Sequence, residues 1–285
     1  METARIAKPF PGPKLYQRRA ESALPLLVRQ AQAQSTVFYS ALAPELGMTN
    51  PRNLNYVLGS VGSALEQLSD KWKENIPPIQ CLVINKLEEL PGEGVAWFIS
   101  KKEDFRKLSL KQRREILRIE LQKTFAYPKW YEVLNAFGLK PAVVDFTEPI
   151  RGAGKYHGGP ESDEHKEMKR FIATHPQAVG LGNIGHGTNE YELPSGDLLD
   201  VSFQATDFWY AVEVKTKKAP YSDLVRGIFQ CIKYKAVIEA VQASRLLPQN
   251  CRVILAIEGH LPSDLLALKN MLEVDVLERI DFRNG

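Results

Sequence analysis

The sequence has few cysteines and histidines, which excludes several kinds of site. Only three of its 285 residues are cysteines, Cys81, Cys231 and Cys251, and they lie far apart among apolar neighbours. Such thiols are typical of small buried side chains in a reducing compartment, not of a disulfide framework or a zinc site. The five histidines form no cluster with metal-ligand spacing, and His165 is expected on the surface of a helix's first turn.

Long apolar runs are also lacking. No uninterrupted run approaches the ~18 residues of a transmembrane helix, and the first residues carry prolines and charges where a signal peptide is apolar. We therefore expect a cytoplasmic protein with no membrane contact. The composition, 44% hydrophobic and 25% charged, is globular, and the length suits about two domains. The net charge of +3 is compatible with a nucleic-acid partner but does not establish one.

The most informative segment carries charged side chains within an apolar strand. Residues 211–215 read Ala-Val-Glu-Val-Lys, so the two valines face one side of the strand while Glu213 and Lys215 face the other. One face is therefore expected to be core, and the other is expected to carry chemistry.

A second acid precedes this strand. Residues 198–203 predict another strand, which contains Asp200, and residues 204–207 predict a hairpin loop. Facing residues of antiparallel strands have Cβ atoms roughly 4.5 to 5.5 Å apart, so Asp200 can stand beside Glu213. The register is open at this point, and Asp197 is the alternative to Asp200. Two carboxylates this close repel unless a cation lies between them, and Mg²⁺ suits such a site.

An acid followed by Glu-x-Lys resembles the PD-(D/E)XK superfamily of restriction endonucleases and DNA-repair nucleases. The resemblance covers roughly the last 125 residues, the size of a small domain. Asp200 matches the first acid, Glu213 and Lys215 match the Glu-x-Lys half, and Leu199 stands where the family's proline is expected. The resemblance implies that Asp200, Glu213 and the Val214 carbonyl bind Mg²⁺, for which Mn²⁺ can substitute. It also implies that Lys215 orients the attacking water and helps to deprotonate it.

A predicted helix from residue 222 to about residue 244 carries further candidates. Arg226, Gln230 and Tyr234 recur every fourth residue and so form a polar stripe. Gln230 and Tyr234 resemble a motif that follows Glu-x-Lys in several nuclease families, which implies that they position the nucleophile, the lysine or the backbone. Arg226 is a candidate DNA contact. The alternative is an ordinary solvated helix face.

Residues 162–175 predict a capped amphipathic helix. Glu164 lies in line with its apolar stripe at Met168. Because superfamily members often carry a glutamate here as an additional metal ligand, Glu164 is the candidate and Glu167 the reserve. Acids in a first helical turn are also ordinary complements of the helix dipole.

The order of predicted elements gives the fold class. We expect an α/β protein with a restriction-endonuclease-like αβββαβ core in residues 151–285, whose first strand lies near residues 178–181 and whose last covers residues 252–257. Residues 1–99 are expected to form a mainly helical, winged-helix-like domain, and residues 100–150 a basic helical connector. The glycine-rich loop at residues 151–160 is expected to be a hinge.

The first third of the chain predicts a helix-turn-helix. Helices are expected at residues 25–34, 36–46 and 52–72, followed by a hairpin of residues 79–86 and 95–99. Recognition residues commonly lie at the start of the second helix, and those here are Asn50, Arg52, Asn53 and Asn55. Dimerisation or partner docking is the alternative role for such a unit.

Basic residues are concentrated after this domain. Residues 100–124 contain nine lysines and arginines against four acids. Three of them, Lys111, Arg114 and Arg118, are candidates for phosphate contacts that add affinity without sequence information. The alternative is an exposed, charge-rich connector.

These patterns together predict a metal-dependent DNA endonuclease. Restriction or antiphage defence is the expected setting, by analogy alone. The alternatives are a repair or junction-resolving nuclease and a non-catalytic DNA-binding regulator or adaptor with a nuclease-like domain. The expected partners are DNA, a second copy in a homodimer and a defence-system protein.

Overall fold

The chain forms two compact units, Met1–Val144 and Asp145–Gly285, in the computed structural model. The structure describes residues 7–95, 98–99, 105, 107–155, 161–182, 184–205, 208–248 and 250–283. Most of the expected connector, as far as residue 144, belongs to the first unit. Among the described residues, no helix combines the length and the apolar character needed to cross a bilayer.

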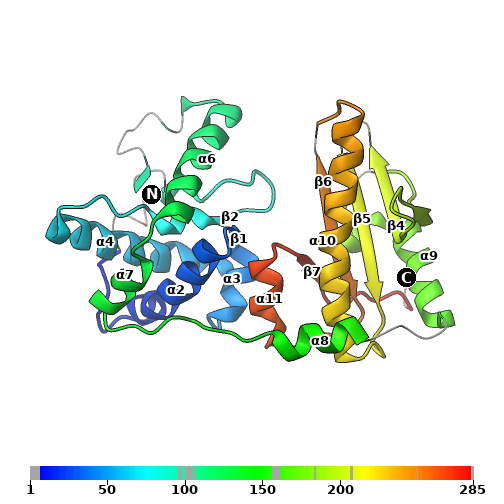
Figure 1. Ribbon diagram of the computed structural model, residues 1–285, viewed down its shortest axis with the longest axis horizontal. Helices are drawn as coiled ribbons and strands as arrows, with labels where there is room; N and C mark the ends of the chain where they lie inside the picture. Colours follow the sequence, from blue (N-terminus) through cyan, green and yellow to red (C-terminus); the bar gives the residue numbers. More distant parts are fainter. Residues whose placement is uncertain are drawn as a thin grey trace. The chain divides into compact units, whose positions relative to one another are not determined.

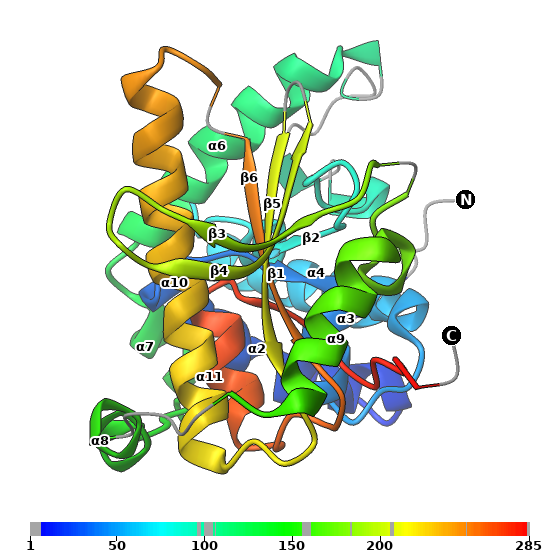
Figure 2. The same ribbon diagram turned by 90° about the vertical axis from the view of Figure 1, so that its right-hand side faces the viewer.

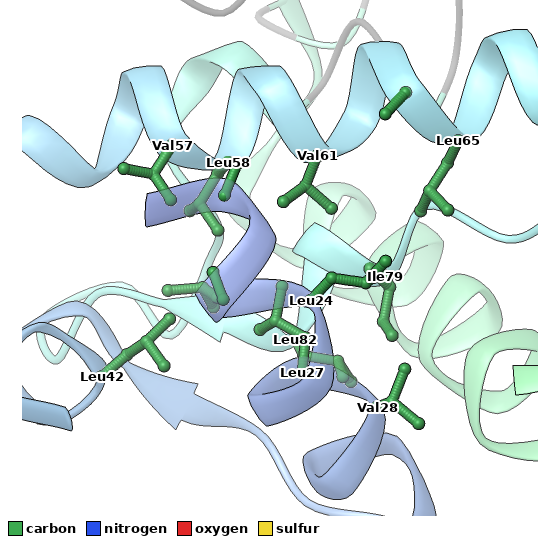
Figure 3. Close-up of a cluster of buried hydrophobic side chains, with 14 of the residues drawn as sticks. Leu24, Leu27, Val28, Leu42, Val57, Leu58, Val61, Leu65, Ile79 and Leu82 are labelled. Atoms are coloured by element: carbon green, nitrogen blue, oxygen red, sulfur yellow. The ribbon is translucent and has the colours of Figure 1, made fainter. Parts of the chain in front are cut away.

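Helices dominate the first unit. They are α2 (Leu15–Gln32), α3 (Tyr39–Glu45), α4 (Leu54–Trp72), α6 (Leu110–Ala126) and α7 (Trp130–Ala136), with short 3₁₀ turns η1 (Pro51–Asn53), η2 (Ile79–Leu82) and η3 (Glu93–Val95). The apolar faces of α2 and α4 meet in the main core, where Leu24 and Leu27 pack with Val61 and Leu65 (Figure 3).

The first helix starts much earlier than its sequence suggested. Pro25 lies inside α2 instead of in its first turn. The Gln17 side chain accepts a hydrogen bond from the Lys14 N–H at 3.2 Å and donates one to the Pro9 carbonyl at 2.7 Å. These bonds hold the chain at the helix start. Pro25 has no N–H to donate, so one internal hydrogen bond of α2 is missing.

The expected hairpin after α4 takes a different form. Strand β2 (Val83–Ile84) pairs in parallel with β1 (Val37–Phe38), which precedes α3. Val95 ends a 3₁₀ turn and residues 98–99 are helical, whereas residues 96–97 lie outside the described residues. The predicted strand partner at residues 95–99 was therefore wrong in the part that the structure describes.

The second unit is built on a mixed sheet with the order β3-β4-β5-β6-β7. Its strands are β3 (Thr188–Glu192), β4 (Leu198–Ala205), β5 (Phe208–Lys215), β6 (Cys251–Ile257) and β7 (Asp275–Leu277). The pairs β3-β4 and β4-β5 are antiparallel, whereas β6 and β7 continue the sheet in parallel with β5.

One predicted strand of this unit was wrong. Residues 178–181 fall in η5 (Pro176–Val179) and the turn after it, where Gly180 has a φ of 71°. A proline that begins the turn and a residue with left-handed backbone that ends it are incompatible with an extended strand. The first strand, β3, follows later, and the order helix, strand, strand, strand, helix, strand is observed from α9 to β6.

Helices α9 (Asp163–Thr174) and α10 (Tyr221–Ser244) cover opposite faces of the sheet (Figures 1 and 2). Alternate residues of β5 therefore enter two different cores. Val212 and Val214 pack with the α9 side, and Ala211 packs with the α10 side. Two further helices, α8 (Thr147–Lys155) and α11 (Leu265–Met271), contribute to the α10 side. The expected glycine-rich hinge begins inside α8, and residues 156–160 lie outside the described residues.

Replacing Leu24 by alanine is expected to lower the free energy of unfolding by about 2–5 kcal/mol, because this fully buried side chain would leave a cavity. Leu15→Ala in the same helix is the matched control. Its side chain is 55% exposed, so the change should stay within about 0.5 kcal/mol. Urea-induced unfolding followed by circular dichroism measures both, and equal losses would contradict the assignment of the core.

Candidate active site

The register of β4 and β5 brings the first acid beside the second. The antiparallel ladder ends at the pair of Val201 and Val212, and Asp200 and Glu213 are the next residues of the two strands. The Asp200 carboxylate is close enough to raise the pKa of Glu213. The Val214 N–H donates a hydrogen bond to Asp200 Oδ2 at 2.8 Å. Asp197, the alternative, instead accepts hydrogen bonds from Lys233 at 2.7 Å and Ser195 at 2.6 Å. The structure therefore places Asp200 in the site.

Glu213 and Lys215 form a buried ion pair on the α10 face. Lys215 Nζ lies 2.9 Å from Glu213 Oε1 and 3.0 Å from Asp223 Oδ1. Lys215 is 7% exposed and Glu213 is 3% exposed. A lysine ammonium has three protons, and its longest contact here is to Gln230 Oε1 at 3.4 Å. Asp223 was not among the candidates, although its place in the first turn of a helix after Glu-x-Lys was visible.

The predicted glutamine and tyrosine of α10 reach the same place. Gln230 Nε2 donates to the Tyr234 hydroxyl at 3.1 Å, and that hydroxyl lies 3.5 Å from the Leu198 carbonyl of β4. Both side chains thus connect Lys215 to the strand that carries Asp200. Arg226, on the same helix, is half-buried.

The buried charges shift one another's pKa values. Burial raises the pKa of Glu213 to about 7, and repulsion from the Asp200 carboxylate adds to the effect of burial. Burial alone would lower the pKa of Lys215, but the Glu213 and Asp223 carboxylates outweigh it and hold that pKa above its ordinary value. Lys215 is therefore a cation at neutral pH, while the raised pKa makes Glu213 easier to protonate than an ordinary glutamate.

A second group of charged residues reaches Asp200 from the α9 side. His165 Nε2 lies 3.0 Å from the Val214 carbonyl oxygen and 3.6 Å from Asp200 Oδ2, and its Nδ1 lies 2.8 Å from Glu161 Oε1. Lys169 Nζ pairs with Glu161 and lies 4.0 Å from Asp200 Oδ1. His165 is therefore half-buried and not the surface residue that we expected.

The sequence held a signal for this group. Glu161, His165 and Lys169 recur every fourth residue, which places them along one line. His165 and Lys169 belong to α9, and Glu161 precedes its first residue. The predicted ligand Glu164 belongs to a different line. It lies 2.9 Å from Lys218 Nζ and 3.6 Å from Arg283 Nη2, and its reserve, Glu167, is exposed.

The surroundings of His165 favour its charged form. Burial would lower its pKa, but the Asp200 carboxylate, the Glu161 carboxylate and the Val214 carbonyl raise it to about 9. In the same way, burial would lower the pKa of Lys169, and the Glu161 and Glu190 carboxylates raise it. An imidazolium thus contacts both the carboxylate and the carbonyl that were expected to bind a metal.

The predicted DNA contacts of the first unit lie on its surface. The exposed residues at the start of α4 and on α6 are Asn50, Arg52, Asn53, Asn55, Lys111, Arg114 and Arg118. Three of these side chains have partners in this unit. Asn50 Oδ1 accepts a hydrogen bond from the Arg52 N–H at 3.0 Å, Arg114 donates to the Glu88 carbonyl at 2.9 Å, and Arg118 donates to Glu115 at 2.7 Å.

Comparison of the chain with protein-family models, curated proteins and solved structures found no match. Within the described ranges, no three side chains of His, Cys, Asp or Glu are arranged to bind a metal ion. The candidate donors are two carboxylates, Asp200 and Glu213, together with the Val214 carbonyl. This oxygen set fits Mg²⁺, which binds through one or two carboxylates and keeps several waters. The repulsion that helps to raise the pKa of Glu213 is also what a cation beside both acids would relieve.

The stability of the metal-free protein is expected to fall as pH rises from about 7 to 9. His165 has a pKa of about 9 in the folded state against an ordinary value of 6.5, so the folded state binds more protons than the unfolded state in this range. Protonated His165 contributes on the order of 2 to 3 kcal/mol to the free energy of unfolding. This contribution is complete below pH 6.5 and is lost as pH rises through 9.

His165→Ala should remove most of this dependence. Urea-induced unfolding at several pH values in EDTA measures it for both proteins. The same slope in wild type and variant would show that His165 is not charged at neutral pH.

Proposed function

We propose that the second unit is a metal-dependent endonuclease that hydrolyses DNA phosphodiester bonds, with a PD-(D/E)XK-like αβββαβ core. The observation that carries the proposal is the convergence of Asp200 and Glu213 with the Lys215 ammonium where β4 meets β5. Acids and a lysine held together in this way suit the hydrolysis of a phosphate ester at a metal ion.

Asp200, Glu213 and the Val214 carbonyl are the groups that would hold Mg²⁺ or Mn²⁺. When bound, the ion polarises the phosphate and lowers the pKa of water. His165 already contacts two of these oxygens as a cation, so the imidazolium and the metal ion compete for them. Glu164, which pairs with Lys218, remains a candidate ligand only if that pair opens.

The two polar residues of β5 take different roles in this proposal. Because its pKa is raised, Lys215 donates hydrogen bonds and stabilises negative charge on phosphate, and it does not accept a proton at neutral pH. Its long contact to Gln230 is the one that a water can replace at least cost. Glu213, paired with this lysine, would hold the metal ion together with Asp200, and the ion would lower the pKa of that water. Tyr234 keeps Gln230 in position.

The first unit is proposed to contact DNA. The exposed polar start of α4 is its base-reading candidate, and the basic side chains of α6 are its phosphate-binding candidates. A restriction or antiphage setting, a homodimer and a defence-system partner remain part of this proposal. A repair or junction-resolving nuclease is the second candidate, because the same chemistry serves branched DNA.

Lys215→Ala is expected to reduce cleavage of plasmid DNA in Mg²⁺ by about 100-fold or more, the usual cost of removing a group that stabilises transition-state charge. Gel analysis of supercoiled, linear, branched and single-stranded substrates, with Mg²⁺, Mn²⁺ or EDTA, measures the effect and identifies the substrate class. Lys217→Ala is the matched control, because Lys217 is an exposed lysine just beyond the strand. Equal cleavage by wild type and Lys215→Ala would refute the role of Lys215.

His165→Ala is expected to raise the affinity for Mg²⁺ about tenfold or more at neutral pH, because the cation that competes for the Asp200 carboxylate and the Val214 carbonyl is removed. Isothermal titration calorimetry measures this affinity directly. Asp200→Asn is the opposite control and should weaken binding. A lower Mg²⁺ affinity in His165→Ala would show that the imidazole is itself a ligand.

A further inference from the structure

One carboxylate beside Lys215 has no role in the reaction described so far. Asp223 Oδ1 lies 3.0 Å from Lys215 Nζ, almost as close as Glu213 Oε1 at 2.9 Å. The Asp223 side chain is only 16% exposed. Glu213 has a second task as a proposed metal ligand, whereas the contact with Lys215 is the one that occupies the Asp223 carboxylate.

The start of α10 explains why Asp223 turns toward the strand. Asp223 is the third residue of the helix, where an acidic side chain commonly accepts a hydrogen bond from the backbone N–H of the N-cap residue. The N-cap residue here is Pro220, which has no N–H. That bond cannot form, and the carboxylate accepts a hydrogen bond from Lys215, which lies eight residues earlier on β5.

A glycine one turn further along α10 lets the stem of Lys215 lie against the helix. Gly227 follows Asp223 by four residues and so lies on the same line of α10. A Cβ atom at Gly227 would lie 3.0 Å from Lys215 Cε and 3.0 Å from Leu255 Cδ1, closer than ordinary van der Waals contact. Glycine is a poor helix former, and the close approach of the lysine gives a packing reason for its place inside this helix.

The direction of the Lys215 ammonium is thus set by its surroundings. Its stem is fixed against Gly227, and two of its protons are directed at the carboxylates of Glu213 and Asp223. The third proton is left for the long contact to Gln230 Oε1 at 3.4 Å, which a water can replace.

We propose that Asp223 is a positioning residue of the active site, which holds the Lys215 ammonium so that its third proton points toward the attacking water. Asp223 does not touch the substrate and acts only through Lys215. The inference rests on the proposed nuclease function, because it assigns Asp223 to that reaction.

Single-turnover cleavage of plasmid DNA in Mg²⁺, together with DNA binding followed by fluorescence anisotropy in EDTA, tests the inference. Asp223→Ala should lower the cleavage rate about tenfold or more, because the lysine loses its orientation, and should leave DNA affinity unchanged. Asp223→Asn keeps an oxygen acceptor at the same place and should recover most of the rate. Asp264→Ala is the matched control and should cleave as wild type, because the exposed Asp264 accepts a hydrogen bond from Tyr221 at the same end of α10.

Two further variants show whether Asp223 acts through the lysine. Adding Asp223→Ala to Lys215→Ala should lower the rate no further than Lys215→Ala alone, because the interaction is already lost. Gly227→Ala should lower the rate without changing DNA affinity, because its Cβ displaces the lysine stem. This variant tests the same arrangement if Asp223→Ala does not fold.

Several results would overturn the inference while the nuclease proposal stands. They are an unchanged rate in Asp223→Ala, an equal loss of rate in Asp223→Asn, weaker DNA binding that accounts for the loss, and a further loss in the double variant. A wild-type protein that cleaves no DNA substrate in Mg²⁺ or Mn²⁺ would instead refute the proposed function, and this inference with it.

Discussion

The structure of the second unit is constrained by two charged side chains, Glu213 and Lys215, which lie on a strand that is covered on both faces and must therefore be paired. An unpaired charge in such a place costs several kcal/mol, so the elements around Glu213 and Lys215 must supply partners. Helix α10 brings Asp223 and Gln230 to the lysine, and its rotation about its own axis is therefore set by charge as well as by apolar packing. On the other face, His165 provides a positive charge beside Asp200.

Periodicity predicted the elements on which this pairing depends. The alternation of valine with charge in β5, and the four-residue spacing of Gln230 and Tyr234, identified both the strand and the face of α10 that meets it. Short apolar stretches were less informative, because a few residues fit a strand and a turn equally well. At residues 178–181 the neighbouring Pro176 and Gly180 decided in favour of a turn. The parallel pairing of β1 with β2 joins distant segments, and no local pattern encodes it.

The acids and the lysine could be predicted, and so could the buried stripe of Met168 and Ile172 on the helix that covers Asp200, but the adjacent line of this helix, with His165 and Lys169, was not recognised as part of the site. One residue along a helix turns a side chain by about 100°, so Glu164 and His165 point in clearly different directions. Met168, Lys169 and Ile172 face the sheet, and this rotation carries His165 to the Val214 carbonyl. Lys169 is buried among apolar neighbours because its ammonium reaches acids from two elements, Glu161 and Glu190. A sequence pattern that counts apolar residues alone assigns such a lysine to the surface.

The two units break local rules in opposite ways. Around Glu213 the chain crowds carboxylates together and then surrounds them with its own cations, so every charge described there has a partner. Around Gln80, both amide atoms are buried without a hydrogen-bond partner in the part of the chain that the structure describes, and a glycine lies in the middle of α4. Neither arrangement improves the fold, and departures from local consistency concentrate at functional sites. The crowded acids are relieved by the cations beside them, whereas the end of Gln80 shares the space beside Gly62 with the ring of Phe98.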